Sequence, residues 1–201
     1  MTKKSDNTIT PQVSADLELV RLSLIDANNF GQIIEKYEPK LLRYISYFTG
    51  LSHDSAEDVL QETFLKVFRN LNGFNQSLSF SSWIYRIAHN EAINYLKKNS
   101  SKDVLSLEGD DDEAASLIDI LQSDDDVVKT VDKHQMAEKV RQVLKLLRDE
   151  YREILVLKYL EDYDYIEISD ILKKPLGTVG VLLSRAKESF KQTAKKLQIS
   201  F

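Results

Sequence analysis

The apolar side chains of this 201-residue chain recur every three to four positions over most of its length. That spacing places them along one face of an α-helix, whereas a half-buried β-strand alternates apolar and polar residues. We find no convincing alternating segment, and helix breakers are scarce, with 6 glycines and 3 prolines. No internal repeat is evident. The pattern therefore predicts an all-α fold.

The composition narrows the function classes. Cysteine is absent, which excludes disulfides, thiolate catalysis and cysteine-bound metals and is typical of the cytoplasm, where we expect the protein. No apolar run approaches the ~20 residues that span a bilayer, and the N-terminus lacks the apolar segment of a secretory signal. The three histidines, His53, His89 and His134, lack metal-binding spacing. Because a nucleophile elbow and a glycine-rich phosphate loop are also missing, we expect no metal, no cofactor and no enzyme.

Charge is distributed unevenly along the chain, whose net charge is −5. Residues 99–135 carry 3 Lys+Arg against 11 Asp+Glu, a net charge of −8, whereas residues 170–201 carry 7 against 2, a net charge of +5. The acidity therefore belongs to the middle of the chain, and the basic C-terminal element remains compatible with nucleic-acid binding.

These shifts predict two small helical domains joined by an acidic flexible linker. The expected parts are a disordered N-terminus at 1–14, a first domain at 15–98, a linker at 99–132 and a second domain at 133–197. In the first domain Ser14 is a candidate N-cap and Gly50 a candidate C-cap, while Asp54 and Glu57 form a pair like a capping box.

The second domain contains a short helix, a tight turn and a long helix, expected at 165–173 and 178–197. Asp164 and Glu167 have the spacing of a capping box at the start of the short helix. The arrangement predicts a helix-turn-helix, which places its second helix in the major groove. Amphipathic hairpins without a DNA-binding role share this pattern. The apolar residues expected to join the two helices are Ile168, Ile171, Leu172, Leu176, Val179, Leu182, Leu183 and Ala186.

The segment 80–98, FSSWIYRIAHNEAINYLKK, has two unlike faces when it is drawn as a helix. One face is apolar and typical of a core, with Ile84 and Ala88 near its centre. The opposite face collects a different set: Trp83, Arg86, Asn90, Asn94 and Lys97. In an acidic protein this second face raises the question of which ligand it meets.

Two stretches together resemble one protein family. DSAEDVLQETFLKVFRNL…FSSWIYRIAHNEAINYLKK is similar to region 2 of bacterial RNA polymerase sigma factors of the sigma-70 family, and LRDEYREILVLKYLEDYDYIEISDILKKPLGTVGVLLSRAKESF is similar to their region 4. Order and spacing match the extracytoplasmic-function (ECF) group. The resemblance implies a non-catalytic subunit that directs promoter recognition, DNA melting and transcription initiation. It implies as partners the β′ coiled coil and the β flap of core RNA polymerase, promoter DNA and a possible anti-sigma factor.

The resemblance also implies functional residues in the first domain. The positions that match the contact with the β′ coiled coil are Asp58, Gln61, Glu62 and Lys66, for which a solvated helix face is the alternative. Those that match contacts with the melted promoter strand are Asn75, Gln76, Ser77, Trp83, Arg86, Asn90, Asn94 and Lys97. Flipped bases suit amides, aromatic rings and cations. Phe74 and Phe80 are alternatively loop anchors, and Trp83 is alternatively part of the core.

The start of the final helix departs from the family. After Gly177, Thr178 and Val179 the family usually places two basic residues and a small polar one, whereas this chain has Gly180 and two apolar residues. We therefore expect altered or weak recognition of the upstream promoter element. The remaining candidate contacts are Thr178, Val181, Ser184, Arg185, Lys187 and Lys191. A left-handed conformation is expected at Lys173 in the preceding turn.

Two further alternatives concern the whole chain. The acidic linker, with Asp110, Asp111, Asp112, Glu113, Asp124, Asp125 and Asp126, either enters the polymerase cleft as a nucleic-acid mimic or acts as a solvated spacer. The chain as a whole is alternatively a stand-alone helix-turn-helix regulator whose first domain is a sensor or a dimerisation domain. A ligand sensor needs an apolar pocket, and the sequence does not call for one.

Overall fold

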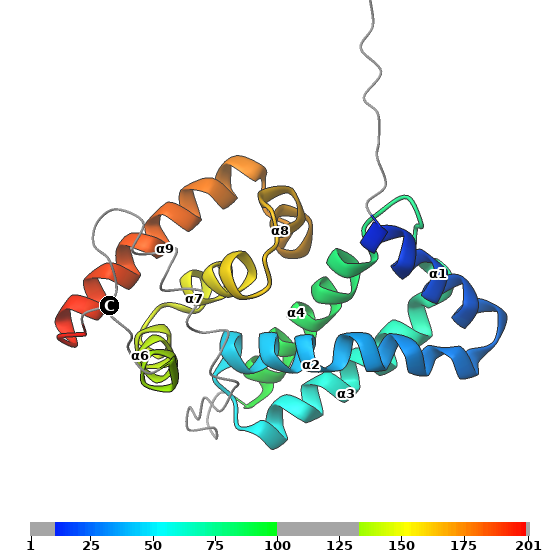
Figure 1. The fold of residues 1–201 in the computed structure, drawn as a ribbon, viewed down its shortest axis with the longest axis horizontal. Coiled ribbons are helices and arrows are strands. Elements are labelled where there is room, and N and C mark those ends of the chain that lie inside the picture. Colours follow the sequence, from blue (N-terminus) through cyan, green and yellow to red (C-terminus); the bar gives the residue numbers. More distant parts are fainter. Residues whose placement is uncertain (1–10, 100–132, 200–201) are drawn as a thin grey trace, which may run out of the picture.

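The computed structural model describes residues 11–99 and 133–199, and these are helical with no strand among them (Figure 1). The helices of the first domain are α1 (Pro11–Ile25), η1 (Ala27–Asn29), α2 (Phe30–Thr49), α3 (His53–Asn70), η2 (Leu71–Gly73) and α4 (Phe80–Asn99). Those of the second domain are α6 (Lys133–Lys145), α7 (Asp149–Leu155), η3 (Val156–Leu160), α8 (Tyr165–Leu172) and α9 (Leu176–Lys196). The all-α prediction is confirmed.

The ends of the first-domain helices partly match the sequence signals. Gly50 ends α2 with a φ of 70°, as predicted, and its N–H donates to the Ser46 carbonyl at 2.8 Å. The prediction for α3 is wrong by two residues: Ser52, not Asp54, is the N-cap, and its hydroxyl accepts the N–H of Ser55. Glu57 instead lies 3.1 Å from the His53 ring. Helix α1 begins at Pro11, so residues 11–14 are helical where we expected disorder.

The core of the first domain is rich in aromatic side chains. Helices α2, α3 and α4 pack against one another, and α1 covers α2. Tyr37 and Phe80 meet edge to face with ring centroids 5.7 Å apart, and Tyr44 lies 5.2 Å from Tyr85. Because such rings bury large areas, they fix how α4 lies on α2. The apolar face predicted for 80–98 is buried at Ile84 and Ala88.

The helix-turn-helix signals of the second domain are confirmed. The Glu167 N–H donates to the Asp164 carboxylate at 2.8 Å and the Asp164 N–H donates to the Glu167 carboxylate at 3.0 Å, which completes the capping box. Lys173 ends α8 with a φ of 52°, the left-handed conformation expected there. Between α8 and α9, Leu176 is an exception to the predicted packing because it is 50% exposed.

The helix expected at 150–160 changes its winding halfway. Regular α-helix gives way after Leu155 to the π-helical turn η3, in which the Glu161 N–H donates to the Val156 carbonyl at 3.1 Å. Asp162 follows with a φ of 55°. The chain therefore turns at the point where it meets the first domain.

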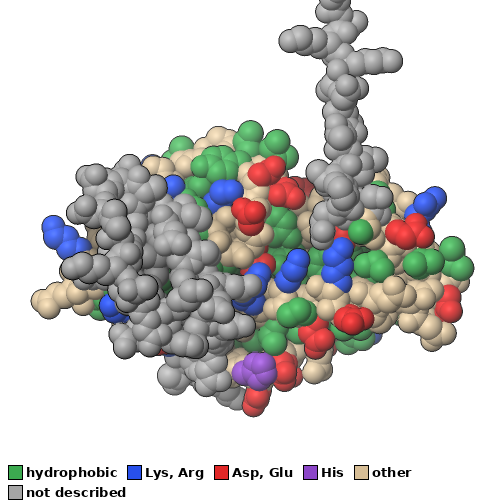
Figure 2. All heavy atoms as spheres, in the orientation of Figure 1, with side chains coloured by type: hydrophobic (Ala, Val, Ile, Leu, Met, Phe, Trp, Pro, Cys, Tyr) green, Lys and Arg blue, Asp and Glu red, His purple; other side chains and the backbone are tan. Residues whose placement is uncertain are grey.

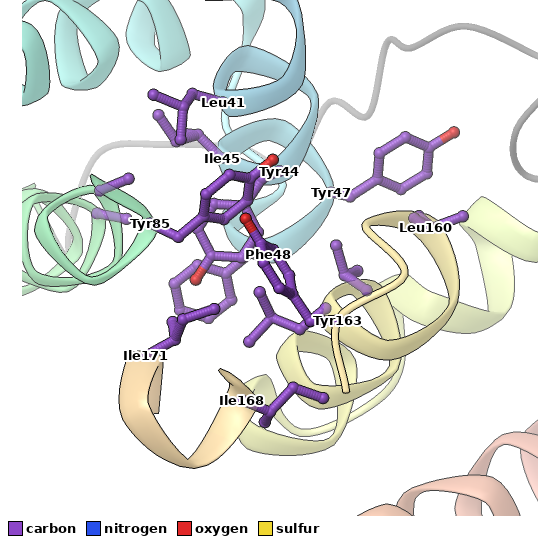
Figure 3. Packing of buried hydrophobic residues seen from close by; sticks show 14 of the residues in the cluster. Leu41, Tyr44, Ile45, Tyr47, Phe48, Tyr85, Leu160, Tyr163, Ile168 and Ile171 are labelled. Atoms are coloured by element: carbon purple, nitrogen blue, oxygen red, sulfur yellow. The ribbon is translucent and has the colours of Figure 1, made fainter. Parts of the chain in front are cut away.

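The two domains pack directly against each other. Helix α8 lies against α4, and α7 with η3 lies against α2 (Figure 1). Buried side chains of both domains form one cluster, in which Tyr44 and Tyr85 approach Tyr163 and Ile171 (Figure 3). The predicted acidic linker and its aspartates lie outside the described residues. Within the described helices, none is long and apolar enough to cross a membrane.

Candidate functional surfaces

A groove between α3 and α4 brings together three of the four residues predicted to contact the β′ coiled coil. Asp58, Gln61 and Glu62 are exposed and line one side of a cavity of about 460 Å³. Leu65, which is 46% exposed, adds apolar surface, and Val59, which is 2% exposed, also lines the cavity. The α4 side is lined by Glu91, Asn94, Tyr95 and Lys98. The groove is thus an acidic and partly apolar surface suited to a helical partner with basic side chains.

Lys66, the fourth of these residues, has a different environment. Its Nζ lies 2.5 Å from the Glu91 carboxylate on α4, so it links the two walls of the groove. Asn94, which we predicted to contact the promoter strand, lines this same groove. The structure therefore places Asn94 with the candidate polymerase contacts, while Asn90 and Lys97 are exposed elsewhere along α4.

An aromatic cluster supports the loop before α4. Phe74 and Phe80 are 6% and 1% exposed, which places both in the core as loop anchors. Trp83 is half-buried and tilted against both rings, with centroids 5.1 and 5.6 Å away. In the loop itself, the side-chain Oδ1 of Asn75 accepts the Ser77 N–H at 3.0 Å. Asn75, Gln76 and Ser77 are therefore exposed on a loop that the cluster holds in place.

Arg86 does not face open solvent. Its Nη1 lies 3.1 Å from the Asp170 carboxylate of α8, and its side chain is only 18% exposed. Asp170 also accepts a hydrogen bond from the Lys173 ammonium at 2.5 Å. The residue predicted to contact promoter DNA is thus engaged by the helix-turn-helix domain.

Two carboxylates of the second domain are buried against the first. Glu161, with a side chain 2% exposed, accepts hydrogen bonds from Arg43 Nε and Nη2 at 2.8 and 2.9 Å and from the Tyr85 hydroxyl at 2.5 Å. Glu153 accepts the Tyr44 hydroxyl at 2.7 Å and pairs with His89. Sequence analysis missed both carboxylates. For Glu153 the sequence did carry a signal of burial, because this residue directly precedes the apolar run ILVL.

Burial and these contacts keep the hydroxyls of Tyr44 and Tyr85 protonated. Burial, followed by the nearby charge of Glu153, raises the pKa of Tyr44 well above its ordinary value. Burial and then Glu161 raise the pKa of Tyr85 in the same direction. Both hydroxyls therefore keep their protons and act as donors to the two carboxylates.

A further arginine joins the domains at a helix end. Arg152 of α7 donates from Nε to the Phe48 carbonyl at 2.6 Å, in the last turn of α2, and from Nη2 to Asp149 at 2.8 Å. Burial lowers the pKa of this guanidinium. A cation at the carbonyl end of α2 also complements its helix dipole.

The exposed surface at the starts of α8 and α9 is apolar. Tyr165, Ile166, Leu176 and Val181 are 43%, 69%, 50% and 53% exposed. Thr178, Ser184, Arg185 and Lys191 are also exposed, whereas Lys187 is half-buried with its Nζ 5.3 Å from the ring centroid of Tyr159. Cations thus occur only from Arg185 onward along α9. Among the described residues there is no group of three or more His, Cys, Asp or Glu side chains placed to hold a metal ion.

Comparison with known proteins identifies both halves of the chain. The family model for sigma-70 region 2 matches residues 33–102, and the model for sigma-70 region 4 matches residues 137–190. The ECF RNA polymerase sigma factor SigW of Bacillus subtilis is 30% identical over 176 residues, covering 86% of this chain and 92% of that protein. The ECF RNA polymerase sigma-E factor of Escherichia coli K12 is 26% identical over 193 residues, covering 94% and 98%.

Two solved structures share the fold. CnrH, solved in complex with the cytosolic domain of CnrY, has a TM-score of 0.65 at 18% identity and covers 90% of this chain and 98% of its own. The sigma factor RpoE of Bartonella quintana, solved with the anti-sigma factor NepR, has a TM-score of 0.60 at 20% identity, with coverage of 83% and 97%.

Proposed function

The chain belongs to the ECF group of the sigma-70 family, so it is an RNA polymerase sigma factor that directs promoter-specific transcription, and we propose that α3 and α4 carry its two principal contacts. In this proposal the α3–α4 groove binds core polymerase and the outer side of α4 holds the melted promoter strand. The match to sigma-70 region 2 explains the presence of the first domain, which a stand-alone helix-turn-helix regulator would not need.

The groove supports the polymerase contact. Asp58, Gln61 and Glu62 are all exposed on one side of α3, beside the exposed apolar surface of Leu65. A basic helix such as one strand of the β′ coiled coil would pair its cations with these carboxylates and cover the leucine. Asn94 lies across the same groove, so we reassign it to this contact.

Exposed polar groups support the promoter contact. The loop with Asn75, Gln76 and Ser77 and the amide of Asn90 are available to bases, and Lys97 is available to a phosphate. Trp83 is already packed on two phenylalanine rings, so its remaining half-exposed surface is at most a partial stacking platform.

The second domain completes the proposed holoenzyme. We propose that the helix-turn-helix meets the upstream promoter element and the β flap. The proposed boundaries are 11–99 for the first domain, from the start of α1 to the end of α4, 100–132 for the linker and 133–197 for the second domain. The apolar start of α9 favours weak upstream recognition, carried mainly by Arg185 and Thr178. The chain itself contributes no catalytic step, since the polymerase performs the chemistry. Because RpoE was solved with an anti-sigma factor, we also propose an anti-sigma partner for this chain.

Transcription in a purified system tests the proposal. Core polymerase and the full chain are incubated with fragmented genomic DNA, and the transcripts are sequenced. Transcripts that start at shared upstream and downstream elements are expected, and they should disappear when Glu62 is changed to Lys. Initiation that does not depend on the chain would overturn the proposal.

A further inference from the structure

We propose that the start of α9 recognises thymine in the upstream promoter element through the C5-methyl group of that base, with Val181 as the principal contact. The inference rests on the proposed contact between the helix-turn-helix and the upstream element, and it names the base that this contact selects. Thymine is the base whose major-groove edge carries an apolar group. The partner that this surface fits is therefore duplex DNA with thymine facing the helix.

Apolar side chains from α8 and α9 are exposed beside one another at this place. Leu176 and Gly180 lie one turn apart on α9, and the Tyr165 ring of α8 lies 4.0 Å from the position that a Cβ of residue 180 would take. Ile166 and Val181, the next residues of the two helices, are 69% and 53% exposed. Figure 2 shows hydrophobic side chains gathered over α8 and the start of α9. A contact with DNA here is therefore largely apolar.

The neighbours of Val181 on α9 favour DNA over a protein as the partner. Thr178, Ser184 and Arg185 lie three or four residues from Val181, so they share one exposed face of the helix with it. The Arg185 guanidinium has no hydrogen-bond or ion-pair partner among the described residues. Helix α9 as a whole carries five Lys+Arg against one Asp+Glu, a net charge of +4. Hydroxyls and a free cation around one valine fit base edges and phosphates, whereas the centre of a protein interface is poor in charge.

Acidic side chains near α8 limit how the duplex can lie. Asp164 and Glu167 form the capping box at the start of α8, and Figure 2 shows acidic side chains next to the hydrophobic ones in this region. Carboxylates repel phosphates, so the phosphate contacts must come from α9. Arg185 and Lys191 are exposed there. We therefore expect the duplex to follow α9, with Val181 at the base edges.

The Val181 side chain selects thymine in two ways, because it has no hydrogen-bond donor or acceptor. Against the thymine methyl it buries apolar surface, and one buried methyl group changes the affinity about fourfold. Against adenine or cytosine it would cover an amino group, and against guanine a carbonyl oxygen. A polar group that is covered without a hydrogen bond weakens binding. The contact thus favours thymine and disfavours the other three bases.

Removal of the methyl group from the DNA tests the inference. The probe is a fluorescent promoter duplex, identified by transcript sequencing, and the protein is the holoenzyme of core polymerase with the full chain. Thymines of the upstream element are replaced by deoxyuridine, which keeps the hydrogen-bonding groups of thymine and lacks only the methyl. We expect the affinity to fall about fourfold for each thymine that the helix contacts. The same replacement in the spacer between the two elements is the control and should change nothing.

The outcomes separate this inference from the proposed function. Binding of the unmodified promoter that does not respond to deoxyuridine would overturn the recognition of methyl groups and leave the proposed function intact. An upstream element without A·T pairs would overturn it in the same way. Failure of the holoenzyme to bind the unmodified promoter would overturn the proposed function, and this inference with it.

Substitution of Val181 tests which side chain contacts the methyl group. Val181→Ser removes the apolar contact at an exposed position, so the fold should be kept, as circular dichroism can verify. At the contacted base pair the parent should prefer thymine to uracil about fourfold, and Val181→Ser should bind the two equally. Gln192→Ala, an exposed change further along α9, is the matched control and should keep the full preference. A Val181→Ser variant that prefers thymine as strongly as the parent does would overturn the assignment of Val181.

Discussion

Arg43 on α2 donates from Nε and Nη2 to the two carboxylate oxygens of Glu161 at 2.8 and 2.9 Å, although the two residues lie 118 positions apart in the chain. The pair belongs to different domains, and the Glu161 side chain is 2% exposed. A bidentate contact of this kind needs the two domains in one orientation. It therefore makes the folding of one domain sensitive to the presence of the other.

Arg43→Ala should uncouple the unfolding of the two domains. Loss of the cation leaves Glu161 buried without its ion-pair partner, which costs about 3–5 kcal/mol if the domains stay together. This cost weakens the contact between the two domains. Trp83 is the single tryptophan and reports on the first domain, whereas far-ultraviolet circular dichroism reports on both.

Urea unfolding followed by these two probes should coincide for the parent chain and diverge for Arg43→Ala. Arg21→Ala removes an exposed arginine of α1 that lies 3.7 Å from Glu18, and it serves as the control with coincident transitions. Coincident transitions in Arg43→Ala would contradict the coupling.

Glu62→Lys should abolish binding to core polymerase. The change reverses the charge of an exposed residue in the α3–α4 groove, so it repels a basic partner without disturbing the core. The free energy of unfolding should stay within about 0.5 kcal/mol of the parent. Glu38→Lys, an equal charge change on the exposed side of α2, is the control and should bind core normally. Affinity for core is measured by fluorescence anisotropy, and equal losses in both variants would contradict a specific groove.

Asn90→Ala and Asn94→Ala should separate promoter melting from polymerase binding. Asn90 is exposed on α4 outside the groove lining, so its loss should impair opening of the promoter and leave affinity for core unchanged. Asn94 lines the groove, so its loss should weaken core binding instead. Permanganate footprinting measures melting on the same holoenzyme preparations. If Asn90→Ala reduces core binding as much as Asn94→Ala does, the proposed assignment of Asn90 to the promoter strand and of Asn94 to core polymerase is wrong.

Local signals in the sequence were the most predictive. The left-handed ends at Gly50 and Lys173 and the capping box of Asp164 depend on a few adjacent residues, so short patterns reveal them. Ser52 competed with Asp54 as an N-cap two residues away, and no short-range pattern decides between them.

The contacts between the two domains could not be predicted from such local patterns. Glu161 resembles an ordinary solvated acid at the end of a helix, because its partners Arg43 and Tyr85 lie 118 and 76 positions away. For the same reason the sequence around Arg86 predicts a solvent-facing cation, whereas in the structure α8 lies beside it. When segments far away in the sequence bury a residue, the local pattern of apolar and polar positions around it does not indicate that burial.

Gly180→Ala should stabilise the second domain by about 1 kcal/mol, because glycine in a helix interior costs about that much relative to alanine. A Cβ there would lie 4.0 Å from the Tyr165 ring, an ordinary contact. Gly50→Ala provides the opposite case: its φ of 70° strains any side chain, so a loss of about 1–2 kcal/mol is expected. Urea unfolding measures both. A Gly180→Ala variant less stable than the parent would indicate an unrecognised constraint on the recognition helix.

Glu167→Gln should stabilise the chain near neutral pH and not in acid. Burial raises the pKa of Glu167, so the folded state prefers the protonated carboxyl. The stability linked to this group is present below the unfolded pKa of about 4.3 and is lost as the pH rises through the higher folded pKa. Glutamine stays neutral and still accepts the Asp164 N–H, so it avoids that loss while it keeps the capping box.

The measurement is the free energy of unfolding of parent and Glu167→Gln between about pH 4 and pH 7. We expect the difference in favour of the glutamine variant to grow with pH across this window. Glu167→Ala lacks the acceptor for Asp164, so it should lose stability at every pH and thereby separates the cap from the charge. A glutamine variant whose advantage shrinks as the pH rises would mean that the ionised carboxylate of Glu167 stabilises the fold after all.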